Sequence, residues 1–457
     1  MFVHPSIVLA KVSPLILGSG MTVTYNITLP GIASALVAAG SEATRWPGGK
    51  VANWYHWKTN SSGPGICSGH ANPNSTFDNF MRDVATPAHL DVAVTVNYGS
   101  NAACTGGGDP SEAAAWVAYA NATQNYGVQW WTVGNEQWAA GALDLHSHPH
   151  SPVQYARIEA SRFYPAMKAA SATPINVCVG VQPKNRYWDP IVLAKARYDC
   201  VEMHYYAQSS EDISDTFLLQ QAIPVLHGYL LKLKGELAAA GHAAAPIYLG
   251  EIGSSTSPPG KQSQSIVQAL FAGQVIGELV NSGVARATWH LGNGDCSMPS
   301  DGGEFAKSIY GWQKWGGAMI FADRQQNGCP PRSIPPETLL ATARAYQVLT
   351  HFAHPGEAAL GTSVSSLPGI CAYATTDAGG FAVMLFNLNE TKSENVPVSI
   401  DGHGSGAGGT ITTYDKATYN RTKNNVWAGV KTAKLRAWSG SFTIPMSPWS
   451  MAVVETQ

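Results

Sequence analysis

Apolar and polar positions follow a repeating order along residues 15–350: short, almost wholly apolar runs alternate with longer segments of helical periodicity. A short apolar run between turn residues is typical of a buried parallel strand, and apolar residues every three or four positions are typical of an amphipathic helix. We predict strands at 15–21, 42–49, 91–99, 130–136, 175–181, 199–206, 245–251 and 284–292. The intervening and following helices are predicted at 30–40, 75–85, 109–122, 152–171, 189–197, 217–240, 263–282 and 336–350.

Eight strand–helix units predict an α/β fold, a (β/α)8 TIM barrel, whose functional residues lie at the C-terminal ends of its strands. The pattern then changes to short alternating strands with Gly, Asp and Asn turns and no helical period, which is typical of an all-β sandwich. The segment VHPSIVLAKV near the N-terminus has the pattern of another strand. We therefore expect residues 1–12 to join the sandwich, residues 13–352 to form the catalytic barrel, and residues 353–457 to form the smaller C-terminal domain.

Composition narrows the choice of partner. Only 13% of the 457 residues are charged and the net charge is −2, so there is no basic face for nucleic acid. No apolar run reaches the roughly 18 residues of a membrane span. The 14 Trp and 18 Tyr suit a neutral, ring-shaped ligand, because aromatic faces pack on sugar C–H groups, but they equally suit the core of a large domain. The oligomeric state stays open.

The seven cysteines show no spacing typical of a metal site. Cys67 and Cys104 lie in Gly-rich loops, as do Cys296 and Cys329. Loop cysteines of this kind favour disulfides, and the odd number leaves at least one cysteine unpaired. We therefore expect a secreted or periplasmic protein whose leader is absent from this sequence.

Two carboxylates end predicted strands. Glu136 closes WWTVGNE and Glu251 closes APIYLGE, which places both at the functional rim of the barrel, on its fourth and seventh strands. A carboxylate at the end of a buried strand is costly without a partner or a purpose. Retaining glycoside hydrolases need such a pair, with the carboxyl groups about 5–5.5 Å apart. We predict Glu136 as general acid/base and Glu251 as nucleophile; the alternative is a pair of ion-paired structural carboxylates.

Other strand ends supply candidate substrate-binding residues. An amide next to Glu136 can hydrogen-bond a sugar hydroxyl, and an arginine on the second strand can hold Glu251 ionised. A phenol on the sixth strand can orient the nucleophile, and an indole on the eighth can floor a sugar pocket. Structural salt bridges and core packing are the alternatives. The candidates are Arg45, Asn97, Tyr98, Asn135, His204, Tyr206 and Trp289.

The segment His146-Ser-His-Pro-His150 follows Glu136 and is interpreted as a lid loop with possible substrate contacts. Its three histidines have no acidic companion within the segment, so a metal site is disfavoured. We expect no metal and no cofactor, and a carbohydrate as the only ligand.

Four motifs strengthen this assignment: Arg45-Trp-Pro-Gly-Gly, Tyr55-His-Trp, Val94-Thr-Val-Asn-Tyr-Gly-Ser and Trp131-Thr-Val-Gly-Asn-Glu-Gln-Trp. They resemble clan A glycoside hydrolases and, within the clan, family 51, the α-L-arabinofuranosidases. The resemblance covers nearly the whole chain. It implies an acid/base in the Asn-Glu pair of the fourth strand, a nucleophilic Glu on the seventh, and a C-terminal sandwich joined by an N-terminal strand.

The sequence departs from family 51 in two places. No carboxylate lies in Leu17-Gly-Ser-Gly-Met21, where the family has a sugar-binding Glu, and Lys50 follows the Pro-Gly-Gly turn, where the family has Asn or Cys. A lysine near the sugar can pair with a uronic-acid carboxylate, which is similar to family 79, the β-glucuronidases and heparanase-like enzymes. We predict a retaining, exo-acting α-L-arabinofuranosidase-like enzyme. The alternatives are a β-glucuronidase-like enzyme that uses Lys50 and a catalytically silent carbohydrate-binding barrel.

Overall fold

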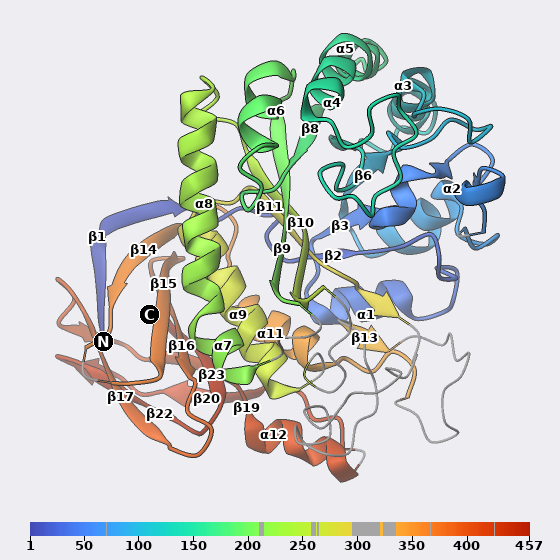
Figure 1. Cartoon of the computed structure of the whole chain (residues 1–457). Helices are drawn as coiled ribbons and strands as arrows, with labels where there is room; N and C mark the ends of the chain where they lie inside the picture. The colour runs from blue at the N-terminus through green and yellow to red at the C-terminus, as the bar shows by residue number, and fades with distance from the viewer. Residues whose placement is uncertain are drawn as a thin grey trace.

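A closed barrel of eight parallel strands forms the larger part of the molecule (Figure 1). The computed structural model describes residues 1–69, 71–209, 214–256, 262, 265–294, 320–322, 335–365, 367–424 and 426–457. The barrel strands are β2 (Gly18–Gly20), β3 (Ala43–Trp46), β6 (Asp91–Val96), β7 (Trp130–Val133), β8 (Asn176–Val181), β9 (Cys200–Gln208), β10 (Ile247–Ser255) and β11 (Arg286–Trp289). Each overlaps its predicted range, and hydrogen bonding between β11 and β2 closes the ring, so the predicted TIM barrel is confirmed.

Helices lie between successive barrel strands along the chain, and a last one follows β11. They are α1 (Ile32–Ala39), α2 (Phe77–Phe80), α3 (Pro110–Ala118), α4 (Pro152–Ile158), α5 (Tyr164–Ala169), α6 (Asp189–Lys195), α7 (Asp215–Gln220), α8 (Ala222–Ala239), α9 (Ile266–Asn281) and α11 (Ala341–Leu349). Three of them run into π-helical turns, η3 (Met81–Ala85), η4 (Tyr119–Thr123) and η5 (Glu159–Phe163). Local sequence sets their starts: the Asp109 side chain accepts a hydrogen bond from the backbone N–H of Ser111, with Pro110 in the first turn.

The second domain is built on nine strands hydrogen-bonded in the order β20-β19-β23-β16-β15-β14-β1-β17-β22. Although β22 and β23 are far apart in this order, they contact each other and share one hydrophobic cluster, so the sheet folds over into a sandwich. The strands are β1 (Phe2–Lys11), β14 (Ala358–Ser363), β15 (Ile370–Asp377), β16 (Gly380–Asn387), β17 (Glu394–Ile400), β19 (Gly409–Asp415), β20 (Lys431–Leu435), β22 (Phe442–Met446) and β23 (Ser450–Thr456).

The N-terminal strand β1 belongs to this second domain, where it pairs antiparallel with β14 and parallel with β17 (Figure 1). Three two-stranded sheets, a short helix and 3-10 turns also lie among the described residues. They are β4 (Tyr55–His56) with β5 (Ser61–Ser62), β12 (Asn293–Gly294) with β13 (Phe321–Ala322), β18 (Ser405–Gly406) with β21 (Trp438–Ser439), α12 (Lys416–Asn420), η2 (Gly65–Cys67) and η7 (Arg421–Asn424).

Helix α9 packs between the barrel and the sandwich, which explains why nearly all of its residues are buried. Two glycines let the sheet approach closely: a Cβ on Gly273 would lie 2.8 Å from Phe386, and one on Gly277 would lie 2.7 Å from Tyr373. Glycine at these positions therefore joins the two domains through one continuous core. None of the described helices has both the length and the apolar character needed to cross a membrane.

Two disulfides are present among the described residues. Cys67–Cys104 links two loops, which confirms the disulfide character predicted for these two cysteines. Cys178–Cys200 joins paired positions of β8 and β9, which the sequence analysis did not anticipate. Cys371 is unpaired. Cys296 and Cys329, the other predicted loop cysteines, lie outside the described residues.

Substitution of Phe80 tests how much the stack between Trp46 of β3 and Phe80 of α2 stabilises the protein. The two rings lie 4.3 Å apart at 12° and both are fully buried. We expect Phe80→Ala to lower the free energy of unfolding by about 3–5 kcal/mol, because it removes a buried ring and leaves a cavity. Urea denaturation measures the change. Val37→Ala, on the exposed face of α1, is the control and should stay within about 0.5 kcal/mol of the wild type; equal effects of the two substitutions would contradict the prediction.

Candidate active site

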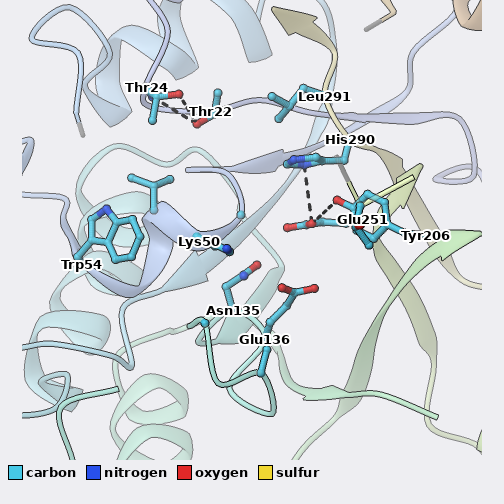
Figure 2. Close-up of a pocket in the computed structure, with 15 residues that line it drawn as sticks. Thr22, Thr24, Lys50, Trp54, Asn135, Glu136, Tyr206, Glu251, His290 and Leu291 are labelled. Atoms are coloured by element: carbon cyan, nitrogen blue, oxygen red, sulfur yellow. Dashed lines mark hydrogen bonds and ion pairs between the residues drawn. The ribbon is translucent and has the colours of Figure 1, made fainter. Parts of the chain in front are cut away.

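A pocket of about 550 Å³ opens at the C-terminal ends of the barrel strands (Figure 2). This is the face where TIM barrels carry their functional groups. Its walls come from the segments that follow β2, β3 and β7 and from the ends of β9, β10 and β11. The lining residues are Thr22, Thr24, Gly49, Lys50, Val51, Trp54, Asn135, Glu136, Ala139, Gly141, Tyr206, Glu251, Thr256, His290 and Leu291.

Glu136 reaches the pocket through a tight turn after β7. Gly134 and Glu136 have φ of 75° and 50°, so the chain reverses within a few residues of the strand end. Asn53, in η1 (Lys50–Asn53), fixes this turn: its Oδ1 accepts from the Asn135 N–H at 2.8 Å and its Nδ2 donates to the Asn135 carbonyl at 2.7 Å. The Glu136 side chain is 21% exposed, and it faces the pocket.

Glu251 is aimed into the same pocket by a β-bulge. The pairing between β9 and β10 shifts register between Leu249 and Glu251, so Gly250 is the extra residue. A side chain at Gly250 would overlap with the Glu202 carboxylate, and this explains glycine at the bulge. The Glu251 side chain is 6% exposed, so its charge needs partners.

Arg45, on β3, supplies the first of these partners. Its Nη1 donates to Glu251 Oε1 at 3.0 Å, and its Nη2 donates to Asn135 Oδ1 at 2.8 Å. Its Nε forms an ion pair with Glu202 Oε1 at 2.8 Å. Arg45 is 2% exposed. One buried guanidinium therefore ties together the segments that carry both predicted catalytic glutamates.

Tyr206 and His204, on β9, complete the contacts of the carboxylates. The Tyr206 hydroxyl donates to Glu251 Oε2 at 2.6 Å. His204 Nδ1 lies 2.9 Å from Glu136 Oε1 and 3.6 Å from Glu251 Oε2, while its Nε2 lies 3.0 Å from Glu202 Oε1. Burial alone would lower the pKa of His204, but the surrounding carboxylates Glu251, Glu136 and Glu202 outweigh it and raise the pKa to about 10. His204 is therefore an imidazolium at neutral pH.

Glu251 is ionised for the converse reason. Burial would raise its pKa, but the positive charges of His204 and Arg45 and the hydrogen bond from Tyr206 lower it well below its usual range. A carboxylate oxygen of Glu136 and one of Glu251 lie within 4.8 Å of each other. The site thus holds one buried anion beside a second, more exposed carboxyl group.

Glu136, His204 and Glu251 form a cluster compact enough to hold a metal ion, and it is the one such group among the described residues. A histidine ligand must be neutral and must offer a lone pair. Both ring nitrogens of His204 instead face carboxylate oxygens, and the ring is protonated. The contacts fit an ion-paired network better than a metal centre.

Most of the predicted site residues come together. Arg45, Asn135, Glu136, His204, Tyr206 and Glu251 are connected by the contacts above. Lys50 lines the pocket, and Figure 2 shows its amine directed toward the centre; it forms no ion pair with a described carboxylate. Asn97 lies outside the pocket lining, where its Oδ1 accepts from the Ser100 N–H at 3.0 Å and holds a loop.

Two predicted substrate-binding residues, Trp289 and Tyr98, lie outside the pocket lining. Trp289 is fully buried and packs against Phe271 of α9, because neighbouring residues on a strand face opposite sides; the next residue, His290, lines the pocket instead. Tyr98 is also buried, and its ring packs on His146 with centroids 4.3 Å apart.

The histidine segment after Glu136 is held by hydrogen bonds outside the pocket lining. His146 Nδ1 contacts Asp144 Oδ1 at 2.8 Å, and His150 Nδ1 lies 3.2 Å from the Gln137 carbonyl. The part of this loop that lines the pocket is Ala139 and Gly141. None of the three histidines lines this pocket, and substrate contacts from them stay a prediction.

Glu202 and Asn53 were missed by the sequence analysis. Glu202 had a readable signal, because Glu202, His204 and Tyr206 alternate along one strand and so share one face. Asn53 had none: it lies in a short 3-10 turn, and only the fold brings it to the backbone of Asn135.

Neither a family model nor a curated protein matches the sequence. The structure, by contrast, is similar over 100% of the chain to solved glycoside hydrolases. An α-L-arabinofuranosidase from Thermotoga maritima in complex with arabinose has 16% identity, 99% of its chain covered and a TM-score of 0.74. A family 51 arabinofuranosidase from Xanthomonas axonopodis pv. citri has 16% identity, 99% of its chain covered and a TM-score of 0.73. A family 44 xyloglucanase from Paenibacillus polymyxa has 12% identity, 99% of its chain covered and a TM-score of 0.68. The protein therefore has the barrel-and-sandwich fold of these clan A glycoside hydrolases.

Proposed function

We propose that the protein is a retaining glycoside hydrolase in which Glu251 is the nucleophile and Glu136 the general acid/base. The observation that carries the proposal is the distance within 4.8 Å between their carboxylate oxygens, at one end of a pocket. Retaining enzymes place the two carboxyl groups about 5–5.5 Å apart, whereas inverting enzymes leave about 6.5–9.5 Å for a water molecule. The short spacing favours double displacement.

The contacts suit each step of that reaction. Ionised Glu251, held by Arg45 and Tyr206, attacks the anomeric carbon while Glu136 gives its proton to the leaving oxygen. A covalent glycosyl–Glu251 ester forms. Glu136, now a carboxylate, takes a proton from water, which attacks the same carbon and releases the sugar with its configuration retained.

An exo-acting α-L-arabinofuranosidase is the substrate assignment that we propose first. It is supported by the motifs around Arg45 and Glu136 and by the likeness to arabinofuranosidase structures over the whole chain. After β2 the pocket wall is formed by Thr22 and Thr24, so hydroxyl groups stand where a sugar-binding carboxylate is expected.

Lys50 favours a second candidate, a β-glucuronidase-like enzyme. Its amine faces the pocket without an ion pair to a described carboxylate, so it is available to bind an acidic sugar (Figure 2). The two disulfides support export to an oxidising compartment for either enzyme.

The catalytic assignment is tested with Glu136→Ala. We expect hydrolysis of an aryl glycoside to fall about 10²–10⁴-fold, because the second step loses its general base. Azide is a small anion that needs no base, so it should restore turnover and yield a glycosyl azide of retained configuration. Steady-state kinetics and NMR of the product measure both effects.

Glu278→Gln is the matched control, since Glu278 on α9 also pairs with a histidine, His227, but lies outside the pocket. It should keep wild-type activity. Full activity of both Glu136→Ala and Glu251→Gln on every glycoside that the wild type cleaves would refute the assignment. Glycan binding without turnover of any glycoside would indicate a silent carbohydrate-binding barrel instead.

The substrate is tested with an aryl α-L-arabinofuranoside and an aryl β-D-glucuronide. We expect the wild type to prefer the arabinofuranoside, and Lys50→Ala to change its kcat/KM by less than about tenfold, because a neutral sugar offers the amine no charge. Lys58→Ala, an exposed lysine outside the pocket, is the control. A preference for the glucuronide that Lys50→Ala abolishes and Lys58→Ala preserves would transfer the assignment to the second candidate.

A further inference from the structure

Glu202 is a fully buried carboxylate that lies beneath the pocket without lining it. Its Oε1 lies 2.8 Å from Arg45 Nε and 3.0 Å from His204 Nε2, so one oxygen contacts two cationic side chains. Gly250 preserves the space that this carboxylate occupies, because any side chain there would overlap with it. A carboxylate so deeply buried is stable only in the presence of such partners.

We propose that Glu202 is a positioning residue, which fixes Arg45 and His204 with one carboxylate oxygen and thereby holds the chain Glu136–His204–Glu251 in its reactive geometry. The inference deepens the proposed function, on which its catalytic part rests. Glu202 acts through its neighbours, since the pocket lining places it out of reach of the substrate.

The charges of the network support this role. Arg45 and His204 carry two positive charges, and Glu202 and Glu251 carry two negative charges. The four charges balance, so this buried part of the network carries no net charge. Without the Glu202 charge, Arg45 would keep only Glu251 as an ion-pair partner among the described residues, and the imidazolium would lose one of its three carboxylate partners.

The balance changes during the proposed reaction. When Glu251 becomes a neutral ester, the charge of His204 acts on Glu136 through the 2.9 Å contact of Nδ1. A nearby cation favours the carboxylate form. The proposed reaction needs a protonated Glu136 in its first step and an ionised Glu136 when water is activated. Glu202 keeps the cation in place through both steps.

The groups that face His204 come from several strands. Glu136 follows β7, Glu251 ends the bulge of β10, and Tyr206 and Glu202 share β9 with it. Arg45 on β3 and His290, directly after β11, are the other ionisable side chains near it, and the Trp138 ring packs edge-on at 5.7 Å. Apart from Glu202, each of these titratable groups contacts Glu251 directly or lines the pocket, so Glu202 can be changed without touching the substrate.

The test is Glu202→Gln, which removes the charge and keeps the shape. Imidazole ¹⁵N NMR of histidine-labelled protein, with the His204 signal assigned by its loss in His204→Gln, follows the ring without any substrate. We expect the His204 pKa to fall by about two pH units. Since folding raises this pKa, the stabilisation by the imidazolium is present at low pH and is lost as pH rises through the folded-state value, which the substitution brings closer to neutral.

Activity supplies the second readout. The alkaline limb of the kcat profile should move down with the His204 pKa, while KM for an aryl glycoside stays within about threefold. Glu202→Asp, which keeps the charge, should restore most of both values and remains informative if Glu202→Gln does not fold. Glu159→Gln is the control, because Glu159 is equally buried but lies outside the pocket, where it accepts from the Arg197 N–H.

An unchanged His204 titration in Glu202→Gln, or in Glu202→Asp where the amide variant does not fold, would overturn the positioning role. A uniform loss of kcat at every pH, with no shift of the limb, would also overturn it and leave a structural role. Because the NMR titration needs no turnover, it can succeed even if no glycoside is cleaved. That result would separate failure of the proposed function from failure of the positioning role.

Discussion

The burial of the Arg45 guanidinium inside the barrel is the constraint on which the active site depends. A charge that is only 2% exposed is tolerated where its donors are matched by anions and carbonyl groups. Arg45 meets Glu251, Glu202 and the Asn135 amide, and it also donates to the Gly48 carbonyl at 3.0 Å. These contacts fix segments of β3, β7, β9 and β10 relative to one another. The distance between Glu136 and Glu251 follows from that arrangement.

Elsewhere in the barrel interior a second buried charge is also matched by partner groups. Beneath the pocket, Arg286 donates to Asp91 and lies over the rings of Trp130 and Tyr248, at 5.8 and 5.5 Å from their centroids. The Cys178–Cys200 disulfide lies in the same cluster as these two rings. A second buried cation is thus paired with a carboxylate and with aromatic faces. The barrel is filled by matched polar and aromatic groups as well as by aliphatic side chains.

The sequence alone predicted the barrel and the two glutamates because parallel strands in a barrel end on one rim, whatever their separation along the chain. It could not predict which of two neighbouring side chains on a strand faces the pocket. Trp289 and His290 are neighbours that face opposite sides, and a single bulge at Gly250 decides where Glu251 points. Asn53 was missed for another reason. Its contact with Asn135 joins two turns, and no periodic pattern in the sequence indicates such a contact.

The buried ionic network of Arg45, Glu202, His204 and Glu251 raises the question of what it contributes to the protein. A barrel interior is ordinarily filled by Val, Ile and Leu, and apolar side chains of similar volume replace buried ion pairs with little loss of stability, or with a gain. The four charged side chains of this network therefore need a reason other than folding. Sugar binding alone does not require an ionised, buried Glu251 within 4.8 Å of Glu136. The nucleophilic catalysis that we propose does require it, because the attacking anion must be desolvated, held in place and paired with an acid.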